Sequence, residues 1–157
     1  MLNIDKSKAL CVSGHRVIGN DLDVDKLTEV FNQAVESGYR YFLIGMAIGF
    51  DTLCFKILQR IKNARTEKDI KLIACVPCKE QDAKFTEKQK EEYSLMLANA
   101  DHIEYVSLSY NKWCMQKRNR FLVDNSSVIV SYLRKNTGGT FYTINYAKTA
   151  GIKIILM

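Results

Sequence analysis

Short apolar runs alternate along this chain with longer segments in which apolar residues recur every three or four positions. The runs are too short for helices, and their continuous hydrophobicity is typical of strands that are buried on both faces. The pattern predicts six strands, at Ala9–Val12, Tyr39–Ile44, Ile70–Val76, Ile103–Val106, Ser127–Leu133 and Ile152–Leu156.

Helical periodicity fills the segments between these strands. The clearest helix has Phe50, Leu53, Cys54 and Ile57 on one face, at the spacing of one helical stripe. An earlier helix begins after an aspartate cap, Asp23 or Asp25, and is stopped by Gly38. Three further helices are predicted at Asp82–Ala100, Trp113–Asp124 and Phe141–Ala150.

Strands that alternate with helices at these lengths indicate βαβ units. We therefore expect an α/β fold: a three-layer, Rossmann-like domain with a mainly parallel central sheet and helices on both faces. By its length, residues 1–157 form one domain that buries a core without metal or disulfide staples.

Composition and charge exclude several classes of protein. With 47% hydrophobic residues, 25% charged residues and one proline, the chain is neither disordered nor of low complexity. Its first residues lack a signal-peptide core, and no run approaches the ~20 apolar residues of a membrane span. We expect a cytoplasmic protein with no membrane partner. The net charge of +6 permits contact with nucleic acid without requiring it.

The five cysteines are scattered through apolar segments, which fits a reducing compartment. Cys75 and Cys78 form a Cys-x-x-Cys pair, but it straddles a strand end rather than opening a helix, so a structural role is favoured over redox chemistry. No second close pair of Cys or His completes a zinc site. We expect no metal and no required cofactor.

Glycines and small polar residues collect where three of the strands end. In a parallel sheet these ends share one edge, which brings together Ser13–Arg16, Gly45–Asp51, Pro77 and Asn136–Thr140. Each glycine alone is a turn residue. Together, and just before two helix N-termini, they suit a phosphate group. Thr140 is predicted to cap the last helix, and its hydroxyl is equally suited to the phosphate.

The charged residues near this edge leave several readings open. Arg118 falls on the apolar face of its helix, so it either pairs with Asp51 or Asp101 or reaches a ligand. Asp51 stabilises a helix N-terminus or accepts from a ribose hydroxyl. Arg120 and Asp124, four residues apart, are expected to form a solvated pair. His15 lacks an evident nucleophile and orienting acid, so a binding or structural role is favoured.

Four motifs in order make the chain resemble a known family. They are Ser-Gly-His-Arg from Ser13, Gly-x-Ala-x-Gly-x-Asp from Gly45, Arg-Asn-Arg-x-x-Val-Asp-x-Ser from Arg118, and Gly-Gly-Thr from Gly138. This pattern is similar to the YpsA-like branch of the SLOG superfamily, a Rossmann-like group that also includes DprA and the LOG phosphoribohydrolases.

The resemblance implies a nucleotide or ADP-ribose-like ligand at the edge described above, bound as by a sensor or regulatory module. The residues expected at the ligand are Ser13, Gly14, His15, Arg16, Gly45, Ala47, Gly49, Asp51, Arg118, Asp124, Gly138, Gly139 and Thr140. LOG enzymes are similar in having Gly-Gly-x-Gly-Thr-x-x-Glu, whose glutamate serves catalysis. Here Thr143 stands at the position of that glutamate, which argues against the enzymatic activity.

Two alternatives to a nucleotide-binding module remain. One is a nucleotide N-glycosidic hydrolase in which Asp51 or Asp124 replaces the glutamate. The other is a protein that binds single-stranded nucleic acid through basic and aromatic residues. That surface would comprise Tyr110, Lys112, Trp113, Lys117 and Arg120. A solvated helix with a core tryptophan is the favoured reading of that stretch. The long third helix or the Phe141–Tyr146 segment would support a homodimer.

Overall fold

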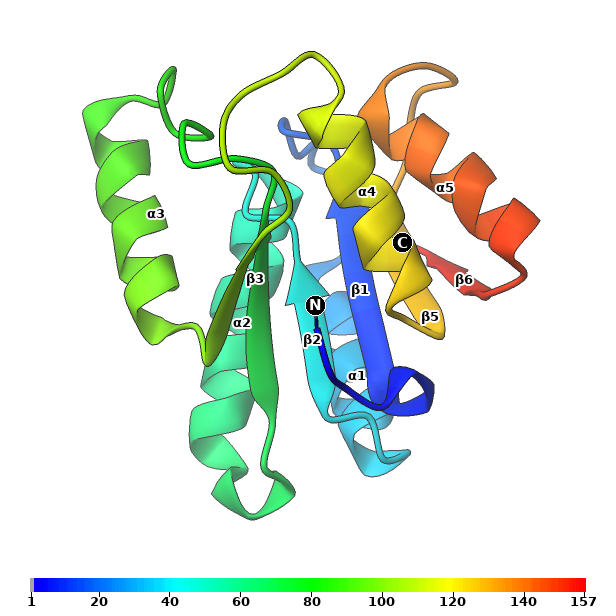
Figure 1. The fold of residues 1–157 in the computed structure, drawn as a ribbon. Helices are drawn as coiled ribbons and strands as arrows, with labels where there is room; N and C mark the ends of the chain where they lie inside the picture. Colours follow the sequence, from blue (N-terminus) through cyan, green and yellow to red (C-terminus); the bar gives the residue numbers. More distant parts are fainter. Residues whose placement is uncertain (1) are drawn as a thin grey trace.

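The computed structural model describes residues 2–157 and contains one six-stranded sheet (Figure 1). Every neighbouring pair of strands is parallel, in the order β4-β3-β2-β1-β5-β6. The strands are β1 (Ala9–Gly14), β2 (Tyr41–Ile44), β3 (Lys71–Val76), β4 (His102–Tyr105), β5 (Val128–Tyr132) and β6 (Lys153–Leu156). The predicted three-layer α/β, Rossmann-like fold is confirmed.

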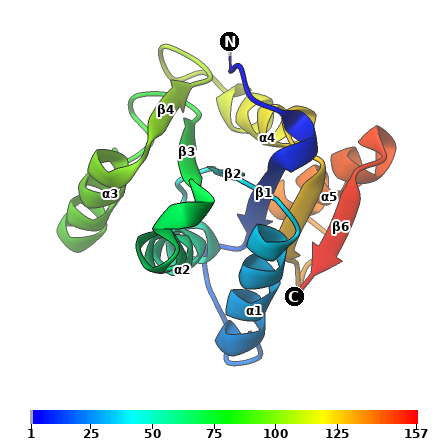
Figure 2. The ribbon, with the colours of Figure 1, turned by 90° about the horizontal axis from the view of Figure 1, so that it is seen from below.

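Five α-helices connect these strands. They are α1 (Val24–Glu36), α2 (Phe50–Ala64), α3 (Glu87–Asn99), α4 (Cys114–Asp124) and α5 (Gly139–Ala150). α1 and α2 lie on one face of the sheet, α4 and α5 lie on the other, and α3 flanks the β3–β4 edge (Figure 2). Within residues 2–157, no helix is long and apolar enough to cross a bilayer.

The core divides into two layers because successive strand residues point to opposite faces. In β1, Leu10 and Val12 pack in the layer that α1, α2 and α3 cover. Ala9 and Cys11 pack in the layer beneath α4 and α5. Both layers bury apolar side chains of β1, which explains why that strand reads as a continuous hydrophobic run.

The strand order has a switch point between β1 and β5. β2, β3 and β4 extend the sheet to one side of β1, whereas β5 and β6 extend it to the other. The connection after β1, through α1, and the connection after β5, through α5, therefore lie on opposite faces of the sheet. They separate at the carboxyl ends of these two strands. In open α/β sheets, ligands bind in the crevice at such a switch point.

Two predicted helix starts are wrong. The helix expected from Asp82 begins at Glu87, because Thr86 forms a capping box in which its side chain accepts from the Gln89 amide. The last helix begins at Gly139 with Gly138 as its N-cap, so Thr140 lies inside the first turn and does not cap it. The predicted N-cap at Asp23 is confirmed, since its carboxylate accepts from the Lys26 amide.

Candidate nucleotide site

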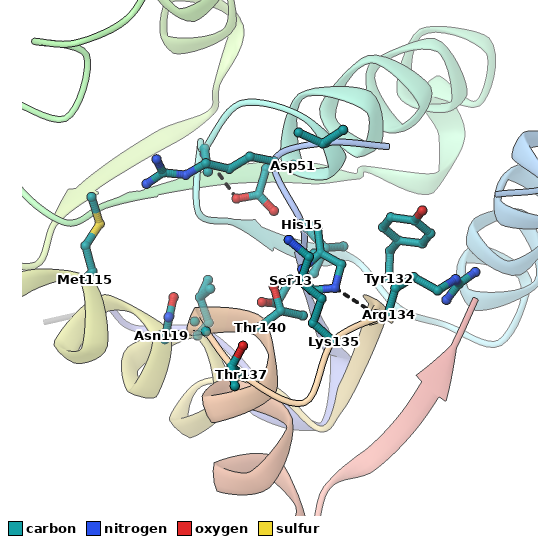
Figure 3. A pocket seen from close by; sticks show the side chains of 18 of the residues that line it. Ser13, His15, Asp51, Met115, Asn119, Tyr132, Arg134, Lys135, Thr137 and Thr140 are labelled. Atoms are coloured by element: carbon teal, nitrogen blue, oxygen red, sulfur yellow. Dashed lines mark hydrogen bonds between the residues drawn. The ribbon is translucent and has the colours of Figure 1, made fainter. Parts of the chain in front are cut away.

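A cavity of about 780 Å³ opens at the carboxyl edge of the sheet, where β1 and β5 are neighbours (Figure 3). Its walls come from the end of β1 and the loop that follows, the start of α2, the inner side of α4, the end of β5 and the start of α5. The cavity thus occupies the switch point that the strand order defines.

The start of α5 borders this pocket without a side-chain cap. Gly138 adopts φ +94°, a conformation that favours glycine, and no side chain bonds the first amides of the helix. Thr140 is 7% exposed, and its hydroxyl forms no hydrogen bond within residues 2–157. The uncapped amides and this hydroxyl are donors available to a ligand.

The end of β1 forms the floor of the pocket. Ser13 is 8% exposed and lines the cavity, and its hydroxyl also lacks a partner in the described chain. Gly14 is required there, because a Cβ would collide with the ring of Phe50. A small side chain and a bare backbone therefore leave room for a ligand above the strand end.

His15 ties the loop after β1 to the segment after β5. Its Nε2 accepts from the Arg134 amide at 2.7 Å, so the neutral ring carries its proton on Nδ1. Burial and the neighbouring Lys135 and Arg134 lower the pKa of His15. The residue is thus a neutral hydrogen-bonding group of the lining.

Asp51, in the first turn of α2, is 6% exposed and has one unsatisfied oxygen. Its Oδ2 accepts from the Ala47 amide at 3.1 Å, whereas its buried Oδ1 has no partner in residues 2–157. Burial raises the pKa of Asp51 to about 6, against the lowering effects of Arg118 and the Ala47 amide. A buried acceptor without a donor is costly, and protonation of the carboxyl lowers that cost.

Arg118 projects from α4 into the protein and is 6% exposed. Its guanidinium donates to the carbonyl oxygens of Gly45 and Cys75, at the ends of β2 and β3, and its Nη2 has only a long contact to the Met115 sulfur. No carboxylate of the described residues lies within 4.0 Å of it, so the first of the two alternatives, a direct ion pair, is not formed. Arg118 bonds strand ends and lines the pocket as well.

Gly45 lies beside both Arg118 and Asp51. A Cβ at this glycine would lie 2.8 Å from Arg118 Nη1 and 3.0 Å from Asp51 Oδ2. The guanidinium and the carboxylate therefore both border the space that a side chain at this position would fill. Asp101, the other predicted partner of Arg118, instead pairs with Lys62 at 2.6 Å.

The structure brings most of the predicted site residues together. The pocket is lined by Ser13, Gly14, His15, Arg16, Ala47, Asp51, Arg118, Gly138, Gly139 and Thr140. Gly45 and Gly49 lie behind this lining. Gly49, at φ +83°, lets the loop pass directly against the backbone of Arg16, where a Cβ would clash.

Asp124 lies outside the pocket lining, at the end of α4. Its carboxylate accepts from the Tyr146 hydroxyl at 2.7 Å, and Arg120 donates to the Tyr142 hydroxyl at 2.5 Å. The predicted Arg120–Asp124 pair is therefore wrong, because both side chains connect α4 to α5 instead. Thr143, at the position of the LOG glutamate, donates to the Gly139 carbonyl at 2.7 Å.

Sequence reasoning missed several lining residues. Tyr132 ends β5, and Arg134 and Lys135 follow it, so the rule that selected Ser13–Arg16 at the end of β1 would also have found them. Asn119, which also lines the pocket, lies inside α4 and not at a strand end, so this rule does not find it.

The five cysteines are free and buried, as expected for small apolar side chains. Burial raises the pKa of Cys11 to about 12 and that of Cys78 to about 11, so their thiolates are disfavoured. Within residues 2–157, no group of three or more His, Cys, Asp or Glu could hold a metal ion.

Trp113 is 58% exposed, so the favoured reading of it as a core residue is wrong. Tyr110 is 68% exposed, and the Lys112 ammonium lies 4.8 Å from the Trp113 ring centroid. These side chains form an aromatic and basic surface before α4 rather than part of the core.

The all-parallel, doubly wound sheet with its crevice at the β1–β5 switch point defines a Rossmann-like α/β protein. More specifically, the chain belongs to the YpsA family, whose model, described as the YspA SLOG family, matches residues 8–153.

Relatives with similar sequences match most of the chain. The chain is 32% identical over 137 residues to the uncharacterised SPbeta prophage-derived protein YoqJ of Bacillus subtilis, covering 79% of each. It is 26% identical over 121 residues to a UPF0398 protein of Bacillus licheniformis, covering 74% of this chain and 64% of that one.

Two structures of DNA processing protein A share the fold. The X-ray structure from Streptococcus pneumoniae superposes with a TM-score of 0.64 at 17% identity, covering 96% of this chain and 50% of that one. A Helicobacter pylori structure, solved for its single-stranded DNA binding mode, gives a TM-score of 0.65 at 14% identity and covers 96% and 65%. This chain thus spans half to two thirds of those proteins.

Proposed function

We propose that this protein binds a nucleotide or a nucleotide-derived molecule, such as an ADP-ribose-like ligand, in the switch-point pocket. The observation that carries the proposal is the set of unpartnered donors around one cavity: the uncapped α5 amides and the Ser13 and Thr140 hydroxyls. Donors that have no protein partner and line one cavity are available to an anionic ligand.

The phosphate of such a ligand fits at the start of α5. The uncapped N-terminus offers amide donors and the positive end of the helix dipole, and the hydroxyls of Ser13 and Thr140 add two donors. Arg16 and Lys135 line the same pocket and form no ion pairs within residues 2–157, so both cations are free for an anion.

Titration calorimetry with AMP and ADP-ribose tests this proposal. We expect binding to the wild-type protein, and we expect Arg16→Ala to weaken it by about tenfold through loss of one charge-assisted contact. Arg60→Ala is the matched control, because Arg60 is exposed on α2 and does not line the pocket. If a broad nucleotide screen leaves the thermal stability unchanged, and Arg16→Ala also changes nothing, the proposal is wrong.

A second candidate is binding of single-stranded nucleic acid along the surface before α4. The exposure of Tyr110 and Trp113, with Lys112 beside the tryptophan ring, favours it, because aromatic platforms next to cations suit stacking and backbone contact. DprA of Helicobacter pylori, which shares the fold, binds single-stranded DNA.

Fluorescence anisotropy with labelled oligothymidylate tests this candidate. If the surface binds nucleic acid, affinity falls steeply with salt, and Trp113→Ala weakens binding by about 1–3 kcal/mol. Leu108→Ala is the control, because Leu108 is also an exposed apolar residue before α4 but offers no ring for stacking. Absence of binding at low salt would exclude the candidate.

A further inference from the structure

Asn119 is a pocket residue whose amide has a fixed orientation. It follows Arg118 on α4, is 9% exposed and lines the cavity. Its Oδ1 accepts from Arg118 Nε at 2.9 Å. A guanidinium has donors only, so the amide cannot be reversed without losing this hydrogen bond. The NH2 group of Asn119 must therefore point away from Arg118.

This NH2 group lies beside the first turn of α5. Asn119 Nδ2 is 3.7 Å from the position that a Cβ on Gly139 would occupy, and no hydrogen bond of residues 2–157 uses it. Asn119, Thr137 and Thr140 border the same part of the pocket (Figure 3). The two N–H donors of the Asn119 side chain thus lie next to the uncapped amides of α5.

We propose that Asn119 Nδ2 donates to the phosphate of the bound ligand and completes, from α4, the anion cradle that α5 begins. Arg118 is its positioning residue, because it fixes which end of the amide faces the ligand. The inference rests on the proposed function, since it assigns a residue to the same pocket. It also specifies the ligand class, because the α4 contact is made to a phosphate and not to the base.

Three probes separate these contacts: inorganic phosphate, ribose 5-phosphate and AMP, each titrated by calorimetry into the wild type and Asn119→Asp. The variant has the same shape but replaces the donors with a carboxylate at the anion. We expect all three affinities to fall by a similar factor, about tenfold or more. Gln116→Glu is the matched control: it makes the same amide-to-acid change on an exposed position of α4 outside the pocket, and we expect less than about a twofold effect.

Loss of folding is distinguished from loss of contact by measuring the thermal midpoint of each free variant. If Asn119→Asp does not fold, Asn119→Ala serves instead, with an expected loss of about five- to tenfold for each phosphate probe. The positioning role of Arg118 is tested in an Arg118→Lys background, which lacks Nε. There we expect Asn119→Ala to cost less than about threefold, because the amide is no longer held toward the anion.

Three results would overturn the inference. A loss confined to AMP would mean that Asn119 contacts the nucleoside rather than the phosphate. Unchanged binding by Asn119→Asp, together with weakened binding by Arg16→Ala, would refute the Asn119 contact and leave the proposed function intact. Failure of all three probes, and also of ADP-ribose and the broad nucleotide screen, to bind the wild type would refute both.

Discussion

Gly45 leaves space in which two buried, opposite charges lie near each other without forming an ion pair. Its missing side chain leaves room for Arg118 Nη1 and Asp51 Oδ2 on the same side of the backbone. Arg118 obtains its hydrogen bonds from strand-end carbonyls, whereas Asp51 keeps an unsatisfied oxygen. Burial raises the pKa of Asp51, and the nearby charge of Arg118 only partly offsets this effect.

Asp51 makes the stability of the protein depend on pH. Its folded pKa of about 6 lies above the ordinary value of 3.8, so its stabilising contribution is fully present below that ordinary value and is lost as the pH rises through about 6. Urea unfolding of the wild type and Asp51→Asn isolates this effect from the other titrating groups. Between pH 4 and pH 7 we expect the wild type to lose about 2 kcal/mol relative to the variant. Parallel stability curves would contradict this account of Asp51.

Gly45→Ala tests how tightly this arrangement is packed. The added methyl would stand 2.8 Å from Arg118 Nη1, which is itself hydrogen-bonded, so the guanidinium cannot move freely. We expect a destabilisation of about 1–3 kcal/mol, measured by urea unfolding. Gly139→Ala is the control, because its Cβ would meet only Asn119 Nδ2, at an ordinary 3.7 Å, and it should leave stability within about 1 kcal/mol of the wild type. Equal effects of the two substitutions would count against the role given to Gly45.

The helices divide according to how their N-termini are satisfied. α1 and α3 have side-chain caps from Asp23 and Thr86. α2, α4 and α5 begin after Gly49, Trp113 and Gly138 without such caps. The first amide of α2 donates to the His15 carbonyl at 3.1 Å instead. The start of α5 is an uncapped helix end that lines the pocket, as expected where a ligand replaces the cap.

The Thr86 cap of α3 is expected to stabilise the fold without affecting ligand binding. Thr86→Ala removes the capping hydroxyl at an exposed position far along the sheet from the pocket lining, and we expect a loss of about 1 kcal/mol in unfolding free energy with unchanged ligand affinity. Ser94→Ala, an exposed change in the middle of the same helix, should cost nothing or stabilise slightly. The prediction fails if the two variants are equally stable.

The elements were predictable where one signal acts locally. The alternation of apolar runs and helical stripes gave all six strands and five helices. β1 extends to Gly14 because its pairing with β5 continues through Ser13 and Gly14, a tertiary contact that the local pattern does not contain. α3 begins late because the Thr86 cap competes with the helical pattern that precedes it.

The site was predictable to the same extent. The strand-end rule located the pocket, because parallel strands bring their carboxyl ends together. It could not orient the side chains: Asp124 turns toward Tyr146, and the Asn119 amide is directed by Arg118. The exposure of Trp113 likewise depends on what packs before α4, which one sequence does not reveal.

In the whole molecule, the strand order brings the candidate ligand-binding groups together in one crevice. The crossovers diverge between β1 and β5, so α2, α4 and α5 can all contribute to a single crevice. We propose this crevice as the nucleotide site.

Amide chemical-shift mapping during titration with AMP and ADP-ribose tests that claim most directly. We predict that the shifts concentrate at residues 13–16 and 138–140 and at the side-chain NH2 of Asn119. Shifts that cluster around Tyr110 and Trp113 instead, or no shifts at saturating nucleotide, would contradict it.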